Sequence, residues 1–272
     1  MNTNFKEMKS SQIKKYIADM LKQENSNLDY YKIIDTLKND ERKTVQKLCN
    51  SVYKFLEYRE KEISRVKQMY DFDKKFITDL YIAGVDEVGR GPLAGPIVAA
   101  AVILKLDYKE SNELILKIND SKKLSQKTRE ELDYIIKDKA VSYCITEISS
   151  MEIDEKGIAW CNNEVLKRAA NGLNIKPSLV LSDGYAIKNC NIENRFIIKG
   201  DTQSASIACA SIIAKVYRDK LMKDYSEIYP QYGFEKNVGY GTKDHIEAIK
   251  KYGYTGIHRK SFLKNIINMF DI

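Results

Sequence analysis

A length of 272 residues suits one full domain with an appendage or two modest domains, and a composition of 43% hydrophobic and 31% charged residues excludes global disorder. The formal net charge of +7 is compatible with a polyanionic partner but does not require one. No apolar run reaches the ~20 residues of a membrane span, and the first residues lack the apolar stretch of a signal peptide. We therefore expect a cytoplasmic monomer without a membrane partner.

Residues 1–75 differ from the rest of the chain, because they contain no glycine and no proline. Apolar residues recur there at helical spacing, and Ser10 can cap the first helix. We predict two or three helices, the last over roughly 41–69. The segment holds 17 Lys and Arg against 12 Asp and Glu, which is about +5 of the whole charge. It is either a solvated helical hairpin on the main domain or an accessory grip on nucleic acid.

From residue 76 to residue 272 the pattern alternates between strands and helices. Strands are expected at 81–88, 96–105, 140–148, 178–182 and 195–199. Helices are expected at 125–138, 150–172, 203–226, 242–252 and 258–270. The first two strands follow each other directly, whereas helices separate the later ones. This order predicts an α/β fold with a mixed sheet that begins as a meander and continues with parallel strands.

The cysteines and histidines argue against a zinc ribbon and against a His-rich metal site. The five cysteines form no CxxC pair, and their odd number favours reduced thiols over a disulfide framework. His245 and His258 are the only histidines. Any metal would therefore have to be held mainly by carboxylates, which favours hard ions such as Mg²⁺ or Mn²⁺.

Carboxylates follow two of the expected strands. Asp86 and Glu87 come directly after the apolar run 81–85, and Asp183 follows another apolar run. Because ligands of open α/β sheets bind beyond the carboxyl ends of the strands, adjacent parallel strands would bring Asp86 and Asp183 together. Two close like charges repel unless a cation or a shared proton holds them. The alternative is that Asp183 only begins a turn with Gly184.

A further candidate acid lies on a helix. The stretch 204–219 is almost wholly small or apolar before Lys215, so this helix must be buried against the sheet, with Asp219 at its polar end. The alternative is that Asp219 only pairs with a neighbouring base. Taken together, the four carboxylates are consistent with a two-metal hydrolase, in which ions about 4 Å apart hold the attacking and leaving oxygens of a phosphodiester.

The segment 89–96 combines three glycines, two prolines and Arg90. Its glycines permit positive φ and close approach of the backbone, so amide groups can reach a sugar or a phosphate. The segment is neither GxxxxGK[ST] nor GxGxxG, which excludes the usual nucleoside triphosphate and dinucleotide loops. The prolines stiffen it, as suits a preorganised site. A plain hairpin would explain one or two glycines, but not Arg90 or the acids before it.

Six motifs occur in a fixed order: DEVGRGPLAGP (86–96), DSKKLS (120–125), LSDG (181–184), KGD with SASIACASIIAKVYRD (199–219), YGTKDH (240–245) and GIHRKSF (256–262). Together they closely resemble ribonuclease HII, the bacterial type 2 ribonuclease H. The resemblance implies a ribonuclease H-like α/β fold, with a mixed five-stranded sheet flanked by helices. Residues 1–75 would then be an α-helical N-terminal extension, and residues 76–272 the catalytic domain with C-terminal helices.

The resemblance also implies an endoribonuclease that depends on two divalent ions, Mn²⁺ or Mg²⁺. Its substrates would be the RNA strand of RNA/DNA hybrids and duplex DNA, nicked 5′ to an embedded ribonucleotide. The products carry 5′-phosphate ends, and the expected roles are ribonucleotide excision repair and removal of RNA primers. The four acids that bind metal in the family, and are catalytic, fall on Asp86, Glu87, Asp183 and Asp219.

Substrate-binding residues follow from the same resemblance. Gly89, Arg90 and Gly91 match the family's sensor of the ribose 2′-hydroxyl, the group that distinguishes RNA from DNA. Tyr240 matches the tyrosine that stacks on the following deoxyribose. The side chains suited to phosphate contacts are Lys122, Lys123, Ser204 and Ser206. For the two lysines, a solvated loop before a helix is the alternative.

Some assignments stay open. His258 and Arg259 are expected either to contact the substrate backbone or to be structural, and His245 to be structural. The other functional hypotheses are a ribonuclease HIII-like hybrid nuclease, a DNA-only nuclease and a non-catalytic hybrid-binding module. The intact acids argue against the last, and the Gly-Arg-Gly triplet and Tyr240 against a DNA-only nuclease. The C-terminal INMFDI is not taken as a clamp-binding motif.

Overall fold

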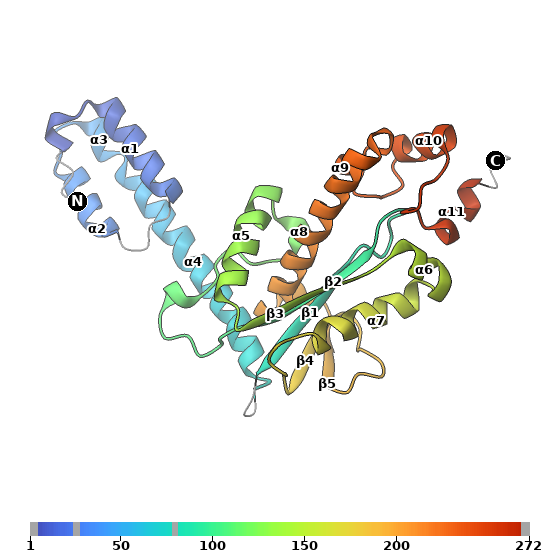
Figure 1. Ribbon diagram of the computed structural model, residues 1–272. Helices are drawn as coiled ribbons and strands as arrows, with labels where there is room; N and C mark the ends of the chain where they lie inside the picture. Colours follow the sequence, from blue (N-terminus) through green and yellow to red (C-terminus); the bar gives the residue numbers. More distant parts are fainter. Residues whose placement is uncertain (1–4, 24–27, 78–80, 268–272) are drawn as a thin grey trace. The chain divides into compact units, whose positions relative to one another are not determined.

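The computed structural model describes residues 5–23, 28–77 and 81–267 (Figure 1). The chain forms two compact units. The amino-terminal unit comprises Met1–Arg65 with Glu110–Leu116, and the main unit comprises Val66–Lys109 with Lys117–Ile272. Their boundary falls earlier than residue 75, because one long helix runs from the first unit into the second.

The amino-terminal unit is helical, with α1 (Ser10–Gln23), α2 (Tyr30–Lys38), α3 (Lys43–Gln46) and the first part of α4 (Cys49–Lys74). Its helices enclose an apolar core of their own, which includes Ile13, Leu37 and Val45. The prediction of a single helix over 41–69 is wrong in detail, because the helix is interrupted between α3 and α4. The prediction did not anticipate α4 continuing to Lys74.

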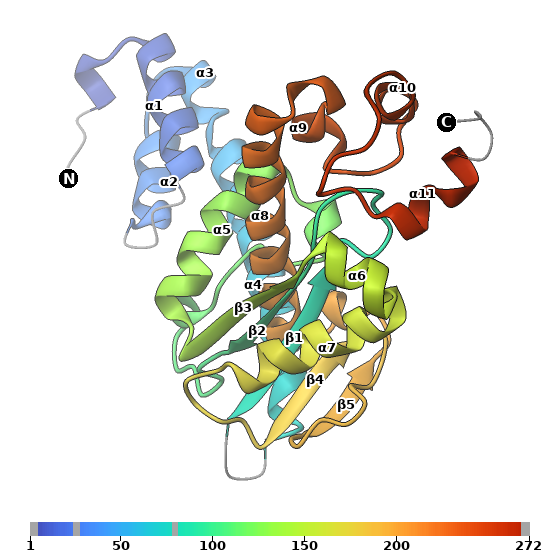
Figure 2. The ribbon, with the colours of Figure 1, turned by 45° about the vertical axis from the view of Figure 1, so that its right-hand side comes forward.

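The main unit contains a five-stranded sheet whose order is β3-β2-β1-β4-β5 (Figure 2). Its strands are β1 (Ile82–Val88), β2 (Ile97–Ile103), β3 (Ser142–Ile148), β4 (Leu179–Asp183) and β5 (Glu193–Ile197). β1, β2 and β3 pair antiparallel, whereas β4 is parallel to both β1 and β5. The predicted mixed sheet, a meander followed by parallel strands, is confirmed.

Helices cover both faces of this sheet. The remaining helices are α5 (Gln126–Lys139), α6 (Ser150–Lys156), α7 (Ile158–Asn171), α8 (Ala205–Ile228), α9 (Phe234–Asn237), α10 (Lys243–Tyr252) and α11 (Lys260–Ile267). α7 packs on one face and α8 on the other (Figure 2). The helix predicted over 150–172 is divided, because Gly157 adopts φ 79° between α6 and α7.

The central strands are built for close helix packing. Every residue of β2 is buried, and three of its seven residues are alanine. A Cβ atom at Gly84 in β1 would collide with the backbone of Ser206 and Ile207 at the start of α8. This contact aligns α8 along β1 and thereby determines which of its residues reach the end of the sheet. No described helix is long and apolar enough to span a membrane.

Candidate active site

The carboxyl ends of β1 and β4 lie side by side. Val85 pairs with Ser182 in the parallel register, so the next residues, Asp86 and Asp183, stand next to each other. The pKa of Asp86 is raised well above its usual value, first by burial and then by the negative charges of Glu87 and Asp183. The predicted juxtaposition of acids at this end of the sheet is therefore present in the structure.

Local contacts orient these acids. The Glu87 N–H donates to Asp86 Oδ1 at 2.8 Å, and the Gly200 N–H donates to Asp183 Oδ1 at 2.7 Å. Burial raises the pKa of Glu87, whereas the positive charge of Arg90 opposes that shift. The Arg90 guanidinium lies 3.6 Å from the Glu87 carboxylate. The acids are thus held mainly by backbone amides and remain only partly neutralised by cations.

The sequence reasoning missed a further acid at this site, Asp201. It lies in a 3₁₀ turn (Gly200–Thr202) that follows β5, another strand parallel to β4. Burial, followed by the charges of Asp183 and Asp120, raises the pKa of Asp201 to about 6. The signal was available in the KGD motif, because an acid shortly after a parallel strand obeys the same rule that identified Asp183.

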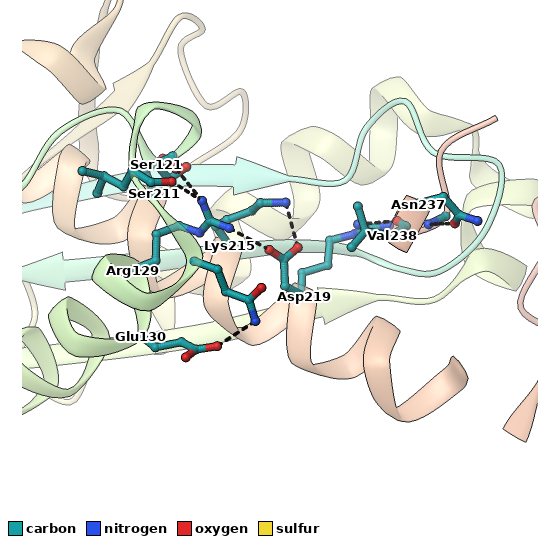
Figure 3. Close-up of polar contacts among 12 residues, drawn as sticks. Ser121, Arg129, Glu130, Ser211, Lys215, Asp219, Asn237 and Val238 are labelled. Atoms are coloured by element: carbon teal, nitrogen blue, oxygen red, sulfur yellow. Dashed lines mark hydrogen bonds and ion pairs between the residues drawn. The ribbon is translucent and has the colours of Figure 1, made fainter. Parts of the chain in front are cut away.

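The structure does not bring Asp219 to these acids. Asp219 is ion-paired with Lys215 at 2.7 Å and with Arg129 at 3.5 Å (Figure 3). Ser211, which hydrogen-bonds to Asp86, precedes Asp219 by eight residues, or about 12 Å along α8. Asp219 also lines a separate groove of about 720 Å³ beside α5, α8 and α9, to which none of the strand-end acids contributes. The structure therefore favours the alternative reading, in which Asp219 pairs with neighbouring bases.

Two lysines of the DSKKLS motif lie near the acids. The positive charge of Lys122 opposes the rise in the pKa of Glu87, and the charges of Lys122 and Lys123 oppose the rise in the pKa of Asp201. Their 3₁₀ turn (Ser121–Lys123) is fixed to α8, because the hydroxyls of Ser121 and Ser211 are 3.0 Å apart (Figure 3). The lysines are therefore placed where an anionic substrate would approach the carboxylates.

The structure does not support phosphate contacts for Ser204 and Ser206. Both are fully buried at the start of α8, where the Ser204 side chain accepts the Ile207 N–H as the N-cap. The Ser206 N–H donates to the buried carboxylate of Asp73 at 2.8 Å. Burial raises the pKa of Asp73 to about 6, although hydrogen bonds from this helix start oppose the shift. Ser204 therefore caps a helix inside the protein, and Ser206 is buried in the first turn of that helix, instead of facing a ligand.

The Gly-Arg-Gly loop lies beside Tyr240. Gly89 adopts φ 92°, and a Cβ atom there would collide with the Arg218 side chain. A Cβ atom at Gly91 would lie 3.8 Å from the Tyr240 ring, and that side chain is 44% exposed. The Gly239 carbonyl accepts the Leu93 N–H at 2.8 Å, which ties the two segments together. Two groups of predicted substrate residues thus form one surface next to the acids.

His245 and His258 form a buried pair behind Tyr240. His245 Nδ1 lies 2.9 Å from the Tyr240 carbonyl, and the two Nε2 atoms are 3.1 Å apart. The Thr255 N–H donates to His258 Nδ1 at 3.0 Å. Because a carbonyl only accepts, these contacts are satisfied when both imidazoles are neutral, with His258 donating to His245. The histidines are structural here, as predicted for His245.

The carboxylates suit a divalent cation. Across residues 5–23, 28–77 and 81–267, no three His, Cys, Asp or Glu side chains are arranged so that they could already hold a metal ion. The strand-end acids nevertheless share one end of the sheet, where the charge of Asp183 raises the pKa of Asp86, Glu87 and Asp201. A hard cation would relieve this repulsion, and oxygen donors of this kind are the ligands it prefers.

Comparison with known proteins agrees with the motifs and the sheet. The ribonuclease HII family profile matches residues 83–265, and the profile of the ribonuclease HII N-terminal domain matches residues 12–77. The chain belongs to the ribonuclease HII family. It is accordingly an endoribonuclease of the ribonuclease H type, and the resemblance inferred from the six motifs is confirmed.

Relatives of known name cover nearly the whole chain. Ribonuclease HII of Clostridium novyi (strain NT) is 65% identical over 98% of this chain and 100% of its own length. Ribonuclease HII of Clostridium tetani (strain Massachusetts / E88) is 60% identical over 97% of each chain.

Solved structures match the sheet-containing part. Ribonuclease H2 of Pyrococcus horikoshii OT3 has a TM-score of 0.59 and 28% identity, over 70% of this chain and 99% of its own. Ribonuclease HII of Archaeoglobus fulgidus, solved in complex with PCNA, has a TM-score of 0.55 and 26% identity, over 68% and 96%. The ribonuclease H-like fold expected from the motifs is confirmed. Most of the C-terminal INMFDI lies outside the described residues.

Proposed function

We propose that this ribonuclease HII is a metal-dependent nuclease whose metal ligands are Asp86, Glu87, Asp183 and Asp201. The observation that carries the proposal is the grouping of these acids at the ends of three parallel strands, where their charges interact. Asp201 replaces Asp219 in the expected set, because Asp219 already has two cationic partners.

The proposed cofactor is a pair of Mg²⁺ or Mn²⁺ ions. Held by these carboxylates, such ions would lower the pKa of a water nucleophile and would stabilise the leaving 3′-oxygen of a phosphodiester. The protein's own contribution is to fix the carboxylates with the amides of Glu87 and Gly200. Lys122 and Lys123 supply positive charge for the nucleic-acid backbone.

The proposed substrates are RNA/DNA hybrids and duplex DNA with an embedded ribonucleotide, which is nicked on its 5′ side. The loop 89–91 and Tyr240 form one surface beside the acids, so recognition of the ribose and cleavage would occur within one site. Because only the 2′-hydroxyl distinguishes RNA from DNA at a given position, this loop is the proposed sensor. We place this activity in the cytoplasm and assign it to the monomer.

The test is cleavage of a labelled DNA duplex that carries one ribonucleotide, in the presence of Mg²⁺ or Mn²⁺. The proposal predicts a single nick 5′ to the ribonucleotide, leaving a 5′-phosphate. No nick should form in an all-DNA duplex or in the presence of a chelator. Cleavage of long hybrids without this nick would instead indicate a ribonuclease HIII-like preference. Nicking that persists in the chelator would overturn the proposed metal dependence.

A further inference from the structure

Two arginines are buried completely without a carboxylate partner. Arg218 and Arg259 are each 0% exposed, and neither forms an ion pair with a carboxylate in the described part of the chain. Arg218 donates to the carbonyls of Ala94, Pro96 and Val238 at 3.2, 3.0 and 2.9 Å. Arg259 donates to the carbonyls of Gly89, Arg90 and Gly95 at 2.6, 2.9 and 3.0 Å. Five of these six acceptors belong to the segment 89–96.

Burying these cations is unfavourable. Burial lowers the pKa of Arg218 to about 10, and burial together with the charge of Arg218 lowers that of Arg259 to about 9. Buried charges are retained only where their hydrogen bonds are well satisfied. Here each guanidinium satisfies three carbonyls at once, which a lysine could not do with the same planar geometry. The two side chains therefore stabilise the conformation of the segment 89–96.

The bonds from Arg259 determine where the loop amides point. In a planar trans peptide the N–H is directed opposite to the C=O, so an inward carbonyl implies an outward N–H. Arg259 holds the Gly89 and Arg90 carbonyls, which belong to the same peptide units as the N–H groups of Arg90 and Gly91. Both residues are exposed, and neither N–H has an acceptor among the described residues. Two adjacent donors are thus directed away from the interior.

Arg218 connects this loop to the segment that carries Tyr240. Its acceptor Val238 adopts φ 43°, a conformation that a β-branched residue rarely takes. The Val238 N–H donates to the Phe234 carbonyl at 2.9 Å, so the strained residue is held on both sides. The same guanidinium binds the carbonyls of Ala94 and Pro96. Loop and tyrosine are therefore fixed to one buried group.

We propose that Arg259 is a positioning residue that presents the N–H groups of Arg90 and Gly91 to the ribose and its adjacent phosphate, and that Arg218 sets the distance between these donors and Tyr240. The proposal rests on the proposed function of the loop 89–91. Its consequence is that ribonucleotide recognition depends on a buried side chain that never touches the substrate.

The test compares Arg259→Gln and Arg259→Lys with wild type, using Arg195→Gln as the control at an exposed, ion-paired arginine. Glutamine has only two N–H donors, and lysine has three but not in the planar arrangement of a guanidinium. We expect each to lower kcat/KM on the single-ribonucleotide duplex by about 10- to 100-fold, as when a preorganised donor is lost. Mn²⁺ binding measured by calorimetry should stay within about twofold of wild type, because the amides of Glu87 and Gly200 that hold Asp86 and Asp183 are not bonded to Arg259. The control should match wild type in both measurements.

A second readout follows the loop itself. The amide resonances of Arg90 and Gly91 should shift in Arg259→Gln, whereas those of Lys122 and Lys123 should not. Folded Arg259 variants with unchanged kcat/KM and unchanged amide resonances would overturn the inference. A variant that loses nicking and Mn²⁺ binding together would also overturn it, in favour of a general folding role. Absence of nicking in wild type would instead refute the proposed function, and the amide resonances would still decide whether Arg259 orients the loop.

Discussion

At the scale of single residues, Asp86 is buried at the end of β1, where it interacts with the charges of both Glu87 and Asp183. Asp86→Asn should lower the nicking rate by at least about a thousandfold, since several kcal/mol of metal-dependent stabilisation is lost. Binding to the ribonucleotide duplex, measured by fluorescence anisotropy, should remain within a fewfold of wild type. A loss of binding as large as the loss of turnover would contradict separate roles for the acids and the loop.

Gly89 combines a positive φ with a steric constraint that Gly253, another glycine with positive φ, lacks. Gly89→Ala should destabilise the fold by about 1–3 kcal/mol and lower nicking about tenfold or more, because the methyl group meets Arg218 as well as straining the backbone. Gly253→Ala is the matched control, since Gly253 has φ 76° but open space around it. Urea unfolding and nicking rates would measure both variants. Equal effects of the two substitutions would argue against a steric constraint at Gly89.

At the scale of elements, the histidine pair fastens the segment before α10 to the loop before α11. Burial and the neighbouring His245 lower the pKa of His258 to about 4, compared with the usual 6.5. Between these two values the unfolded chain binds a proton that the folded chain does not. The pair therefore contributes stability above pH 6.5 that is lost as the pH falls toward 4.

We expect wild type to lose about 2 kcal/mol more stability than His258→Gln between pH 7.5 and pH 5. Buried acids such as Asp73 titrate in the same pH range in both proteins. The difference between their losses of stability therefore reports the contribution of His258. Thermal unfolding at the two pH values gives the measurement. Parallel pH dependence in the two proteins would show that His258 is not held neutral by its surroundings.

The elements also show what the sequence could predict. The mixed sheet, a meander followed by parallel strands, was predicted from the apolar runs, and the juxtaposition of Asp86 with Asp183 from the rule for parallel strands, on the condition that these two strands are adjacent. The position of Asp219 could not be predicted from the sequence. An almost wholly apolar run indicates that a helix is buried, but not the register of that helix along the sheet. That register comes from the contact between Gly84 and the start of α8, which no local pattern encodes. Asp201 was overlooked although its position after β5 fits the same rule.

Buried polar residues of the main unit were also beyond the sequence. Ser204 resembles a phosphate-binding serine at a helix start, but the carboxylate that occupies this helix start is Asp73, far away in the chain. Arg259 carries a charge suited to a contact with the substrate backbone, yet its side chain is fully buried. In both cases a distant segment decides the role.

At the scale of the whole molecule, the amino-terminal unit has its own core, and the candidate catalytic residues all belong to the main unit. Leu37→Ala should therefore cost about 2–5 kcal/mol in the unfolding of the amino-terminal unit. Tyr31→Ala is the control, because Tyr31 lies on the same helix and is 65% exposed. Calorimetry should show a transition shifted only by Leu37→Ala, with nicking at 25 °C unchanged. Loss of nicking in Leu37→Ala while the main unit stays folded would show that the amino-terminal unit takes part in catalysis.

The proposed catalytic acids are those at the strand ends, with Asp201 and without Asp219. The most direct measurement compares nicking of the single-ribonucleotide duplex by Asp201→Asn and Asp219→Asn, together with Mn²⁺ binding by calorimetry. We predict that Asp201→Asn loses at least about a hundredfold in nicking and binds Mn²⁺ more weakly, whereas Asp219→Asn stays within about tenfold and binds Mn²⁺ as wild type does. The reverse order, with Mn²⁺ binding lost in Asp219→Asn and kept in Asp201→Asn, would contradict it.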